Sequence, residues 1–455
     1  MILPACRNHL YSGLLLLLLS ACQTVPKQPD YAAITTQQIA AVSPWQNHTA
    51  ASEVGNLNTL IDAPEVYKLI DLALHNNPSL RQTLLTLEAL EKQQNIARAQ
   101  RLPLVTSGFS ANRNKETNNQ FTTNVNISWQ ADVWGQLADL EQAAELDVLQ
   151  QTLLLQSARD TLAAEVMRNW ITLITQQRAI DIEAQRLDSL QRTQTFILQR
   201  YQQGLGLLED LDSARTAVAS SEAQLESLHE AFRQQQLFMR TLLGQIDLPT
   251  FDNLPKNYPK VALPLAALPT QSLARRPDLQ AAYIAIKSSQ QRTVAAYKDI
   301  LPELSFQAIL QDVASSPRAA LFESPVWSLL GQLTATLYDG GERRANAEIG
   351  ELQTEIAYES YRDQLLIAVT EIEQALSNEQ ALVRQQAFVE KALASAENNL
   401  RQYQQGYQSG LRTILDLLTV QQQNFNLQSQ RDDLIYQRLI NRVNLGLALG
   451  LEIQA

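Results

Sequence analysis

Apolar residues recur every three or four positions along two very long stretches that contain neither Gly nor Pro. The first runs from Gln136 to Gln203 and would extend about 100 Å as one helix, at ~1.5 Å per residue. The segment Gly204 to Gly206 interrupts the pattern, and a second breaker-free stretch follows from Leu207 to Leu243. Runs of this length predict two helices joined by a tight reversal.

The apolar positions beside this reversal are spaced like those of a coiled coil. They step by three and four residues, at Leu187, Leu190, Ile197 and Tyr201 before the turn and at Leu211, Ala214, Val218, Ser221, Leu225, Leu228 and Phe232 after it. Gln194 weakens the ingoing series. A sustained period near ~3.5 residues indicates antiparallel coiled-coil packing, although any helical bundle shares this feature.

A different pattern, with a period of two, precedes each long helical run. In "FTTNVNISWQADV", from Phe121 to Val133, apolar residues and Thr123 alternate with Asn, Thr, Ser, Gln and Asp, and the stretch from Trp327 to Leu337 alternates likewise apart from Leu330. Such stretches have the length and alternation of strands in a membrane barrel. A soluble, half-buried hairpin gives the same alternation, so this alternative stays open.

The whole design occurs twice in the chain. "YQQGLGLLED" at Tyr201 returns as "YQSGLRTILD" at Tyr407, and Pro78 with its following helix returns at Pro277. The residue numbers differ by 206 for the Tyr pair and by 199 for the Pro pair, so seven extra residues lie between Pro302 and the second long helical run. We therefore predict a duplicated module.

This duplication divides the chain into five parts. We expect a signal peptide at residues 1–21, an extended N-terminal segment at 22–60, a first repeat at 61–244, a Pro-rich linker at 245–272 and a second repeat at 273–450. In the second repeat, we expect helices from Glu351 to Gln405 and from Leu411 to Leu445, with the reversal at 406–410. Five Pro residues between Pro249 and Pro269 exclude a continuous helix in the linker.

Each repeat supplies two strands, and four strands cannot close a barrel in lipid without unpaired backbone groups at the edges. Several copies must then combine. Two copies would give a barrel filled by its own side chains, and three would give an open lumen. The small Asn, Ser and Thr side chains on the polar strand faces favour three.

The N-terminus has the features of an export signal. Arg7 precedes an apolar core from Leu14 to Leu19, and "LSAC" resembles a bacterial lipobox in which Cys22 becomes the lipid-modified first residue. The alternative is an ordinary signal peptide that carries a Cys by chance. Gln23 stands where an inner-membrane retention signal would have Asp, which implies sorting to the outer membrane.

Composition excludes several other classes of function. The net charge is −11 without a cluster of Lys and Arg, so a nucleic-acid footprint is missing. Beyond Cys22 the chain has no Cys, and its four His residues are scattered, so no metal-ligating spacing occurs. Apart from adjacent acids such as Glu209 and Asp210 we find no convergent polar site. We expect no catalytic residues and no cofactor besides the lipid on Cys22.

Several motifs together resemble one family, the TolC-like outer membrane factors. They are the lipobox, "ARRPDLQAAY" from Ala274, "DVWGQL" from Asp132, "LYDGGERRA" from Leu337, and the duplicated Tyr-x-x-Gly-Leu turns. Within this family the chain is most similar to the NodT-type lipoproteins of resistance-nodulation-division efflux pumps. "RRPD" by itself also reads as a helix start, with Pro in the first turn and Asp complementing the helix dipole.

The resemblance implies a mostly α-helical fold with a transmembrane β-barrel portion. Three copies would form a 12-stranded barrel that continues as a periplasmic α-helical barrel, in a lipid-anchored outer-membrane protein. The duplicated turns would ring the periplasmic mouth, where a periplasmic adaptor protein docks and an inner-membrane efflux transporter delivers small toxic compounds. A type I protein secretion duct and a coiled-coil scaffold lipoprotein without a pore are the alternatives.

The resemblance also assigns roles to residues at the turns. Tyr407 and Arg412 match the family's closing links to the polar pair on the first hairpin, here Glu209 and Asp210. Asp416 matches the acidic constriction of the lumen, and Thr419 replaces its acidic companion. Positions that match the hairpin tips used for adaptor docking are Gly204, Leu205, Gly410 and Leu411. Partly wet bonds of this kind contribute roughly 0.5 to 1 kcal/mol each and form a releasable latch.

Overall fold

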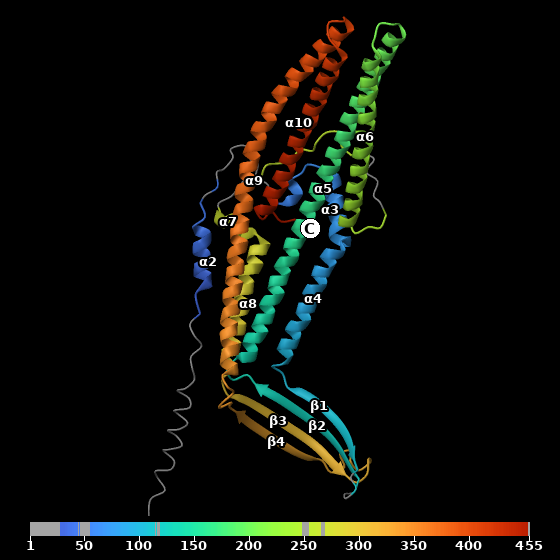
Figure 1. Cartoon of the computed structure of the whole chain (residues 1–455). Helices are drawn as coiled ribbons and strands as arrows, with labels where there is room; N and C mark the ends of the chain where they lie inside the picture. Colours follow the sequence, from blue (N-terminus) through green and yellow to red (C-terminus); the bar gives the residue numbers. More distant parts are fainter. Residues whose placement is uncertain are drawn as a thin grey trace, which may run out of the picture. The chain divides into compact units, whose positions relative to one another are not determined.

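The computed structural model describes residues 28–43, 45, 55–113, 115, 119–247, 254–264 and 269–453. Its elements alternate between helices and strands as the two-repeat pattern predicts (Figure 1). The N-terminal part and first repeat contain α2 (Tyr31–Ala40), the short helix η1 (Leu57–Thr59), α3 (Pro64–Asn76), α4 (Pro78–Ala99), β1 (Leu104–Asn112), β2 (Gln120–Ala131), α5 (Gln136–Gln202) and α6 (Leu208–Leu242). The second repeat contains α7 (Pro269–Arg275), α8 (Pro277–Lys298), β3 (Glu303–Ala314), β4 (Val326–Thr334), α9 (Glu342–Gln408) and α10 (Ile414–Ala448).

The helices of the two repeats match in length. Both α4 and α8 have 22 residues, both α5 and α9 have 67, and both α6 and α10 have 35. The seven additional residues of the second repeat lie in the β3–β4 hairpin, in the three-residue extension of β3 and in the longer connection to β4. The predicted duplication and its length difference are thus confirmed.

The chain divides into two compact units, and the first is built around the sheet. Of the residues that the structure describes, it comprises those within 28–37, 85–153 and 279–364. Its four strands form one antiparallel sheet in the order β1-β2-β3-β4, which confirms the four strands expected per chain. Among the described residues, strands β1 and β4 have a partner strand on one side only, so both edges of the sheet are open.

The strand register places apolar residues opposite one another on one face of this sheet. Trp129 stands opposite Phe306, with ring centroids 5.9 Å apart, and Val125 stands opposite Leu310, which in turn faces Trp327. The other face is mainly polar, and there Gln307 Nε2 donates to Asn126 Oδ1 at 3.1 Å. Each strand therefore separates an apolar face from a mainly polar one, as its alternation predicts.

The helical segments of the first unit follow the same order as its strands. Neighbours are α4 and α5, α5 and α8, and α8 and α9 (Figure 1). Side-chain bonds join each pair in turn: Arg101, just after α4, to Glu141; Ser288 to Asp147; and Thr293 to Thr354. The outer helices of this row are α4 and α9. Along the chain, α4 directly precedes the edge strand β1, and α9 directly follows the edge strand β4.

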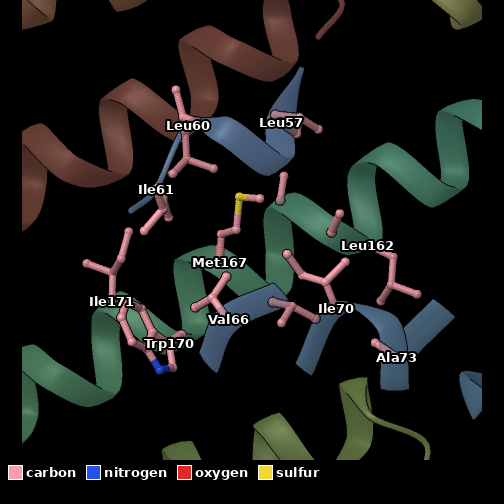
Figure 2. Close-up of a cluster of buried hydrophobic side chains, with 14 of the residues drawn as sticks. Leu57, Leu60, Ile61, Val66, Ile70, Ala73, Leu162, Met167, Trp170 and Ile171 are labelled. Atoms are coloured by element: carbon pink, nitrogen blue, oxygen red, sulfur yellow. The ribbon is translucent and has the colours of Figure 1, made fainter. Parts of the chain in front are cut away.

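The second unit contains the largest apolar core. It comprises residues 38–84, 154–278 and 365–455. Its core gathers fully buried side chains from η1, α3 and α5, including Leu60, Val66, Met167 and Trp170 (Figure 2). Burial of large side chains at ~1.5 to 3 kcal/mol each makes this core the main source of stability in the unit. The same unit contains the two helical reversals.

Two expectations about local structure were wrong. The segment 22–60 was expected to be extended, yet Tyr31–Ala40 is helical, because Asp30 Oδ1 caps its start and Tyr31 packs against Tyr358 at 5.0 Å between ring centroids. The second long helix was expected over 351–405, yet α9 is longer at both ends and contains Gly350 and Gly406. Cys22 and the signal peptide lie outside the described residues.

Candidate functional site

The two helical reversals use the same backbone geometry. Gly204 and Gly410 have φ of 73° and 75°, a region that favours glycine. In the first reversal the N–H of Gly204 donates to the Tyr201 carbonyl and that of Leu205 to the Arg200 carbonyl, and the second reversal repeats both bonds. This is the Schellman motif, which satisfies the last carbonyls of a helix.

The residues after these glycines project into solvent. In a Schellman motif the following residue commonly packs back on its helix. Here Leu205 is 64 % exposed and Leu411 is 80 % exposed. A Cβ atom at Gly204 or Gly410 would meet no atom within 4 Å, so these tips are open. The four predicted docking residues thus lie at the two tips, where the side chains of Leu205 and Leu411 are uncovered.

The helices that leave the two reversals start differently. Thr413 caps α10: its hydroxyl oxygen accepts from the Asp416 N–H at 3.2 Å, and Asp416 Oδ2 accepts from the Thr413 N–H at 3.2 Å. The cap of α6 is Leu207, whose side chain makes no such bond. Asp210, at the position equivalent to Asp416, is therefore not engaged in a capping box.

A small apolar cluster joins the two hairpins close to their tips. We call it the tip cluster, and its buried members are Ile197, Leu211, Ala214, Tyr407, Ile414 and Leu417. These residues come from α5, α6, α9 and α10, so the two hairpins bury apolar surface against each other here. Separation of the hairpins would expose that surface to water at ~25 cal/mol per Å².

Tyr407 is the polar member of the tip cluster. Its ring meets Phe196 edge-on at 5.9 Å between centroids, and the Arg200 guanidinium lies 5.7 Å from the ring centroid. Burial raises the pKa of the Tyr407 hydroxyl, Arg200 opposes this rise and the charge of Asp210 adds to it. The hydroxyl therefore keeps its proton at neutral pH and faces one cation and one anion of the first hairpin.

The predicted partners of the latch are only partly brought together. Asp210 lies close enough to Tyr407 to influence its pKa. Arg412 instead folds over Tyr403 of its own hairpin, 4.6 Å from the ring centroid, and among the described residues no ion pair joins it to Glu209 or Asp210. The predicted links from Arg412 thus stay a prediction.

Asp416 is exposed and has a local partner. The Thr413 hydroxyl donates to Asp416 Oδ2 at 2.8 Å, and the Thr413 hydrogen bonds lower the pKa of this carboxyl, with a smaller effect of Arg412. Thr419 lies one turn further along α10 and donates to the Leu415 carbonyl at 2.7 Å. Between Asp416 and Arg431 the helix carries no charged residue. The constriction role of Asp416 stays a prediction.

The sequence did not identify two arginines that fasten the helices. Arg200 contacts Tyr407 across the hairpins, and a contact so distant in sequence leaves no local signal. Arg276 of "RRPD" is buried and donates to Asp278, to Glu371 Oε2 at 2.7 Å and to the Ala448 carbonyl at 3.2 Å. The motif therefore starts α8 and also ties α8 to α9 and α10.

The described residues contain neither a cluster of metal ligands nor an apolar helical span. No group of three or more His, Cys, Asp or Glu side chains there is arranged to hold a metal ion. Within the same residues, no helix combines the length and apolar character needed to cross a bilayer.

Comparison with known proteins assigns the chain to a family. The model of the family described as "Outer membrane efflux protein" matches residues 69–245 and 268–451, most of the chain. The chain belongs to the outer membrane efflux protein family. It is accordingly an outer-membrane protein of the TolC-like type and not an enzyme.

Individual members of the outer membrane efflux protein family align over nearly the full length. "Outer membrane protein OprJ" of Pseudomonas aeruginosa is 29 % identical, over 96 % of this chain and 94 % of its own. "Pyoverdine export outer membrane protein OpmQ" of Pseudomonas putida is 26 % identical, over 97 % of both chains. The crystal structure of the Campylobacter jejuni CmeC outer membrane channel has a TM-score of 0.82 at 20 % identity, covering 94 % of this chain and 93 % of its own, and this likeness concerns the fold alone.

Proposed function

We propose that three copies of this chain form one closed duct through the outer membrane, through which small toxic compounds leave the cell. The observation that carries this proposal is the four-stranded sheet with one apolar face and two open edges. Edge β4 runs antiparallel to β1, so β4 of one copy can pair with β1 of the next. Three copies give twelve strands and no edge in lipid.

The polar face of the sheet would line the lumen of this barrel. It carries mainly uncharged amides and hydroxyls, such as Asn126 and Gln307. These side chains hydrogen-bond water without binding ions strongly, which suits a passage for varied compounds. The apolar face, with Trp129 and Phe306, would contact lipid tails. A lipid on Cys22 would add an anchor to the same membrane.

The tips would form the inner mouth of the duct. Leu205 and Leu411 are apolar and uncovered, and an apolar pair at the end of a rod suits a protein partner. We assign this partner as a periplasmic adaptor protein, with an inner-membrane transporter of the resistance-nodulation-division type behind it. OpmQ is by its name a pyoverdine export protein, and this supports export of small molecules by the present chain.

The tip cluster would hold the mouth closed until the adaptor docks. Tyr407 is the central element of this latch, because it is buried between Phe196 and Arg200 and lies close to Asp210. The links from Arg412 to Glu209 and Asp210 would form with a neighbouring copy or in another state of the mouth. Asp416 would contribute three carboxylates to the lumen below the latch.

Single-channel recording in planar bilayers tests the duct and the latch together. We expect low conductance for the purified protein and higher conductance after Tyr407→Phe combined with Arg412→Ser, because both side chains restrain the tips. Phe238→Ala, an exposed position on α6 away from the tip cluster, is the matched control. A protein that never conducts, in any variant, would refute the duct, and equal currents in all variants would refute the latch.

A further inference from the structure

We propose that the loop between β3 and β4, residues 315–325, folds over the lipid-facing side of the sheet and inserts Leu321 and Phe322 among the acyl chains of the outer leaflet. Asp312 holds the loop in this position. We call the segment the outer loop, because the strands place it at the end of the sheet away from the helices (Figure 1). The inference rests on the proposed duct, in which the apolar face of the sheet meets lipid, and adds a lipid-binding segment to it.

An acidic residue interrupts the apolar face of the sheet. Asp312 stands opposite Thr123, one row beyond the pair Leu310 and Val125. Residues directly opposite each other in an antiparallel pair point to the same face, and so do residues two positions apart on one strand. Asp312 therefore belongs to the apolar face that carries Leu310. A charged side chain on a face that meets lipid is costly unless another part of the protein covers it.

The length of the apolar face places Asp312 inside the membrane. The ladder of β2 and β3 runs from Leu304 to Ala314, which is about 34 Å along the strand at ~3.4 Å per residue. A strand tilt of about 40° reduces this to about 25 Å, the height of the apolar band of a membrane barrel. Phe121, opposite Ala314, stacks on Phe109 at 6.3 Å between ring centroids, and aromatic residues typically mark the edge of such a band. Asp312 therefore lies one row inside the outer edge.

The outer loop covers this acid. Other side chains of the apolar face are open, since Phe306 is 36 % exposed, Leu310 39 % and Leu329 69 %, whereas Asp312 is 3 % exposed. The Ser324 N–H of the outer loop donates to Asp312 Oδ2 at 3.0 Å. This bond ties the end of the loop to the apolar side of the sheet and supplies a partner for the carboxylate.

The internal structure of the outer loop agrees with a segment folded onto the sheet. Ala320, in the middle of the loop, is fully buried, and its N–H donates to the Ser316 carbonyl at 3.2 Å. A loop that extended into solvent would leave this side chain exposed. On the sheet, the hydroxyl oxygen of Thr123 beside Asp312 is buried as well. The outer loop thus packs over the row of Thr123 and Asp312, which belongs to the apolar face.

Leu321 and Phe322 are the apolar side chains that the outer loop presents outward. Leu321 is 64 % exposed and Phe322 is 38 % exposed. Phe322 has φ of 59°, and no other described residue except Gly has a positive φ. Such a conformation costs energy and persists where the surrounding structure holds it. The two side chains replace the polar surface of Asp312 by an apolar one, continuous with exposed Trp327 on β4. Lipid meets the rest of this face, so continuity favours acyl chains as the occupant.

Fluorescence quenching by labelled lipid tests the position of the outer loop. Leu321→Cys in the full chain, labelled with bimane and reconstituted in phosphatidylcholine vesicles, should lose about half of its fluorescence when the acyl chains carry nitroxides, as expected for a side chain in the apolar band. Leu329→Cys on the apolar face should respond alike. Gln311→Cys, on the polar face at the same height, should respond to aqueous iodide instead. The unsubstituted chain gives the background from Cys22.

The three labels separate the outer loop from the duct. A Leu321 label that iodide quenches and nitroxide lipid does not would overturn the inference, whether the loop extends into water or folds over the lumen. If the Leu329 label still responds to lipid in that case, the loop is wrong and the duct stands. If lipid quenches the Leu321 label but not the Leu329 label, the outer loop binds lipid and the proposed barrel is wrong.

Replacement of Asp312 tests what holds the outer loop. Asp312→Ala removes the acceptor of the Ser324 N–H, so quenching of the Leu321 label by lipid should fall to the level of the Gln311 label. Asp312→Asn keeps an acceptor oxygen and should retain the quenching. Circular dichroism checks that both variants keep their helices. Full lipid quenching in Asp312→Ala, or its loss in both variants, contradicts a loop held by this hydrogen bond.

Insertions distinguish the length of the outer loop from its lipid contact. A short Gly-Ser segment after Ser315 lengthens the loop before the turn at Ser316 and should leave lipid quenching of the Leu321 label unchanged. The same segment after Ala320 separates the buried part of the loop from Leu321 and should abolish the quenching. Both insertions lie outside every helix and strand, so the rest of the fold is matched. Equal quenching in the two insertion variants would contradict the inference.

Discussion

Asp210 and Asp416 stand at equivalent points of the two hairpins, three residues into the helix that leaves each tip. Asp416 is held by the N–H and the hydroxyl of Thr413. Asp210 has Leu207 at that cap and lies close to Tyr407 of the other hairpin instead. The duplication thus kept the acid and changed the residue three positions before it. The Asp416 carboxylate thus closes its own helix, whereas the Asp210 carboxylate is in no capping box and raises the pKa of Tyr407 on the other hairpin.

At the opposite ends of the long hairpins, the two repeats also differ by one residue at equivalent positions. Asn77 Nδ2 donates to the Leu242 carbonyl at 2.9 Å, where the second repeat has Arg276 donating to the Ala448 carbonyl. Both bonds satisfy a carbonyl at the end of a helix that has no partner within it. The amide does so without charge, whereas the guanidinium also requires Asp278 and Glu371.

Replacement of Arg276 should therefore lower the stability more than replacement of Asn77. We expect Arg276→Ala to lower the free energy of unfolding by about 3 kcal/mol, the low end for a buried ion pair because Glu371 is half-exposed. Asn77→Ala should cost about 1 kcal/mol. Denaturant unfolding followed by circular dichroism in detergent measures both changes. Equal losses of unfolding free energy would show that the Asn77 and Arg276 bonds contribute equally.

Glycine replacements separate close packing from backbone conformation. Gly244 has φ of 64°, and a Cβ atom there would lie 2.2 Å from the Asn76 carbonyl oxygen, whereas Gly204 has φ of 73° and open space. We expect Gly244→Ala to cost about 2 to 3 kcal/mol and Gly204→Ala about 1 kcal/mol. Thermal melting of the purified variants measures the difference. A larger loss at Gly204 would contradict this account of the tips.

Exchange of the helix caps tests the difference between the tips. Thr413→Ala should destabilise the start of α10 by about 1 kcal/mol, and Leu207→Thr should stabilise the start of α6 by a similar amount. The second change would also draw Asp210 into a capping box and away from Tyr407. Hydrogen exchange of the tip amides reports the stability, and bilayer conductance should rise with Leu207→Thr. Unchanged conductance would show that Asp210 does not hold Tyr407.

The smallest effect concerns the charge of Asp416. The Thr413 bonds lower its pKa, so the capping contribution is fully present above its ordinary value of 3.8 and is lost only as pH falls through the lower folded value. Asp416→Ala should relieve block of the channel by divalent cations without altering monovalent conductance greatly. Recording with and without Mg²⁺ from pH 7 to 5 checks this, and a block that weakens across this range would assign it to another group.

The sequence predicted the long helices well because their breaker-free runs are unambiguous. The expected end at Gln203 lies one residue from the end of α5. The prediction was wrong at both ends of α9, because it placed the helix boundaries at Gly350 and Gly406. Each makes room for a neighbour: a Cβ atom at Gly350 would lie 3.0 Å from Thr293 Oγ1, and one at Gly406 would lie 2.8 Å from Arg412 Cγ. Such tertiary reasons for a glycine within a helix are invisible in one sequence.

The sequence predicted the two turns of the site but not the side-chain contacts between its helices. Tyr-x-x-Gly-Leu indicates a helix that ends in a Schellman motif, and the structure has it twice. Arg200 beside Tyr407 and Arg276 beside Glu371 join elements that are far apart in the chain. No local pattern encodes such pairs. The position of Arg412 over Tyr403 depends on the side-chain packing around it in the same way.

The equal lengths of the paired helices restrict how this chain can change. One residue added within α5 or α9 would rotate every later side chain by about 100° and disrupt all contacts beyond it. The connection between β3 and β4 has already accepted extra residues without altering a helix. An inserted epitope tag therefore belongs in residues 315–325, where added length leaves the side chains of the paired long helices in register.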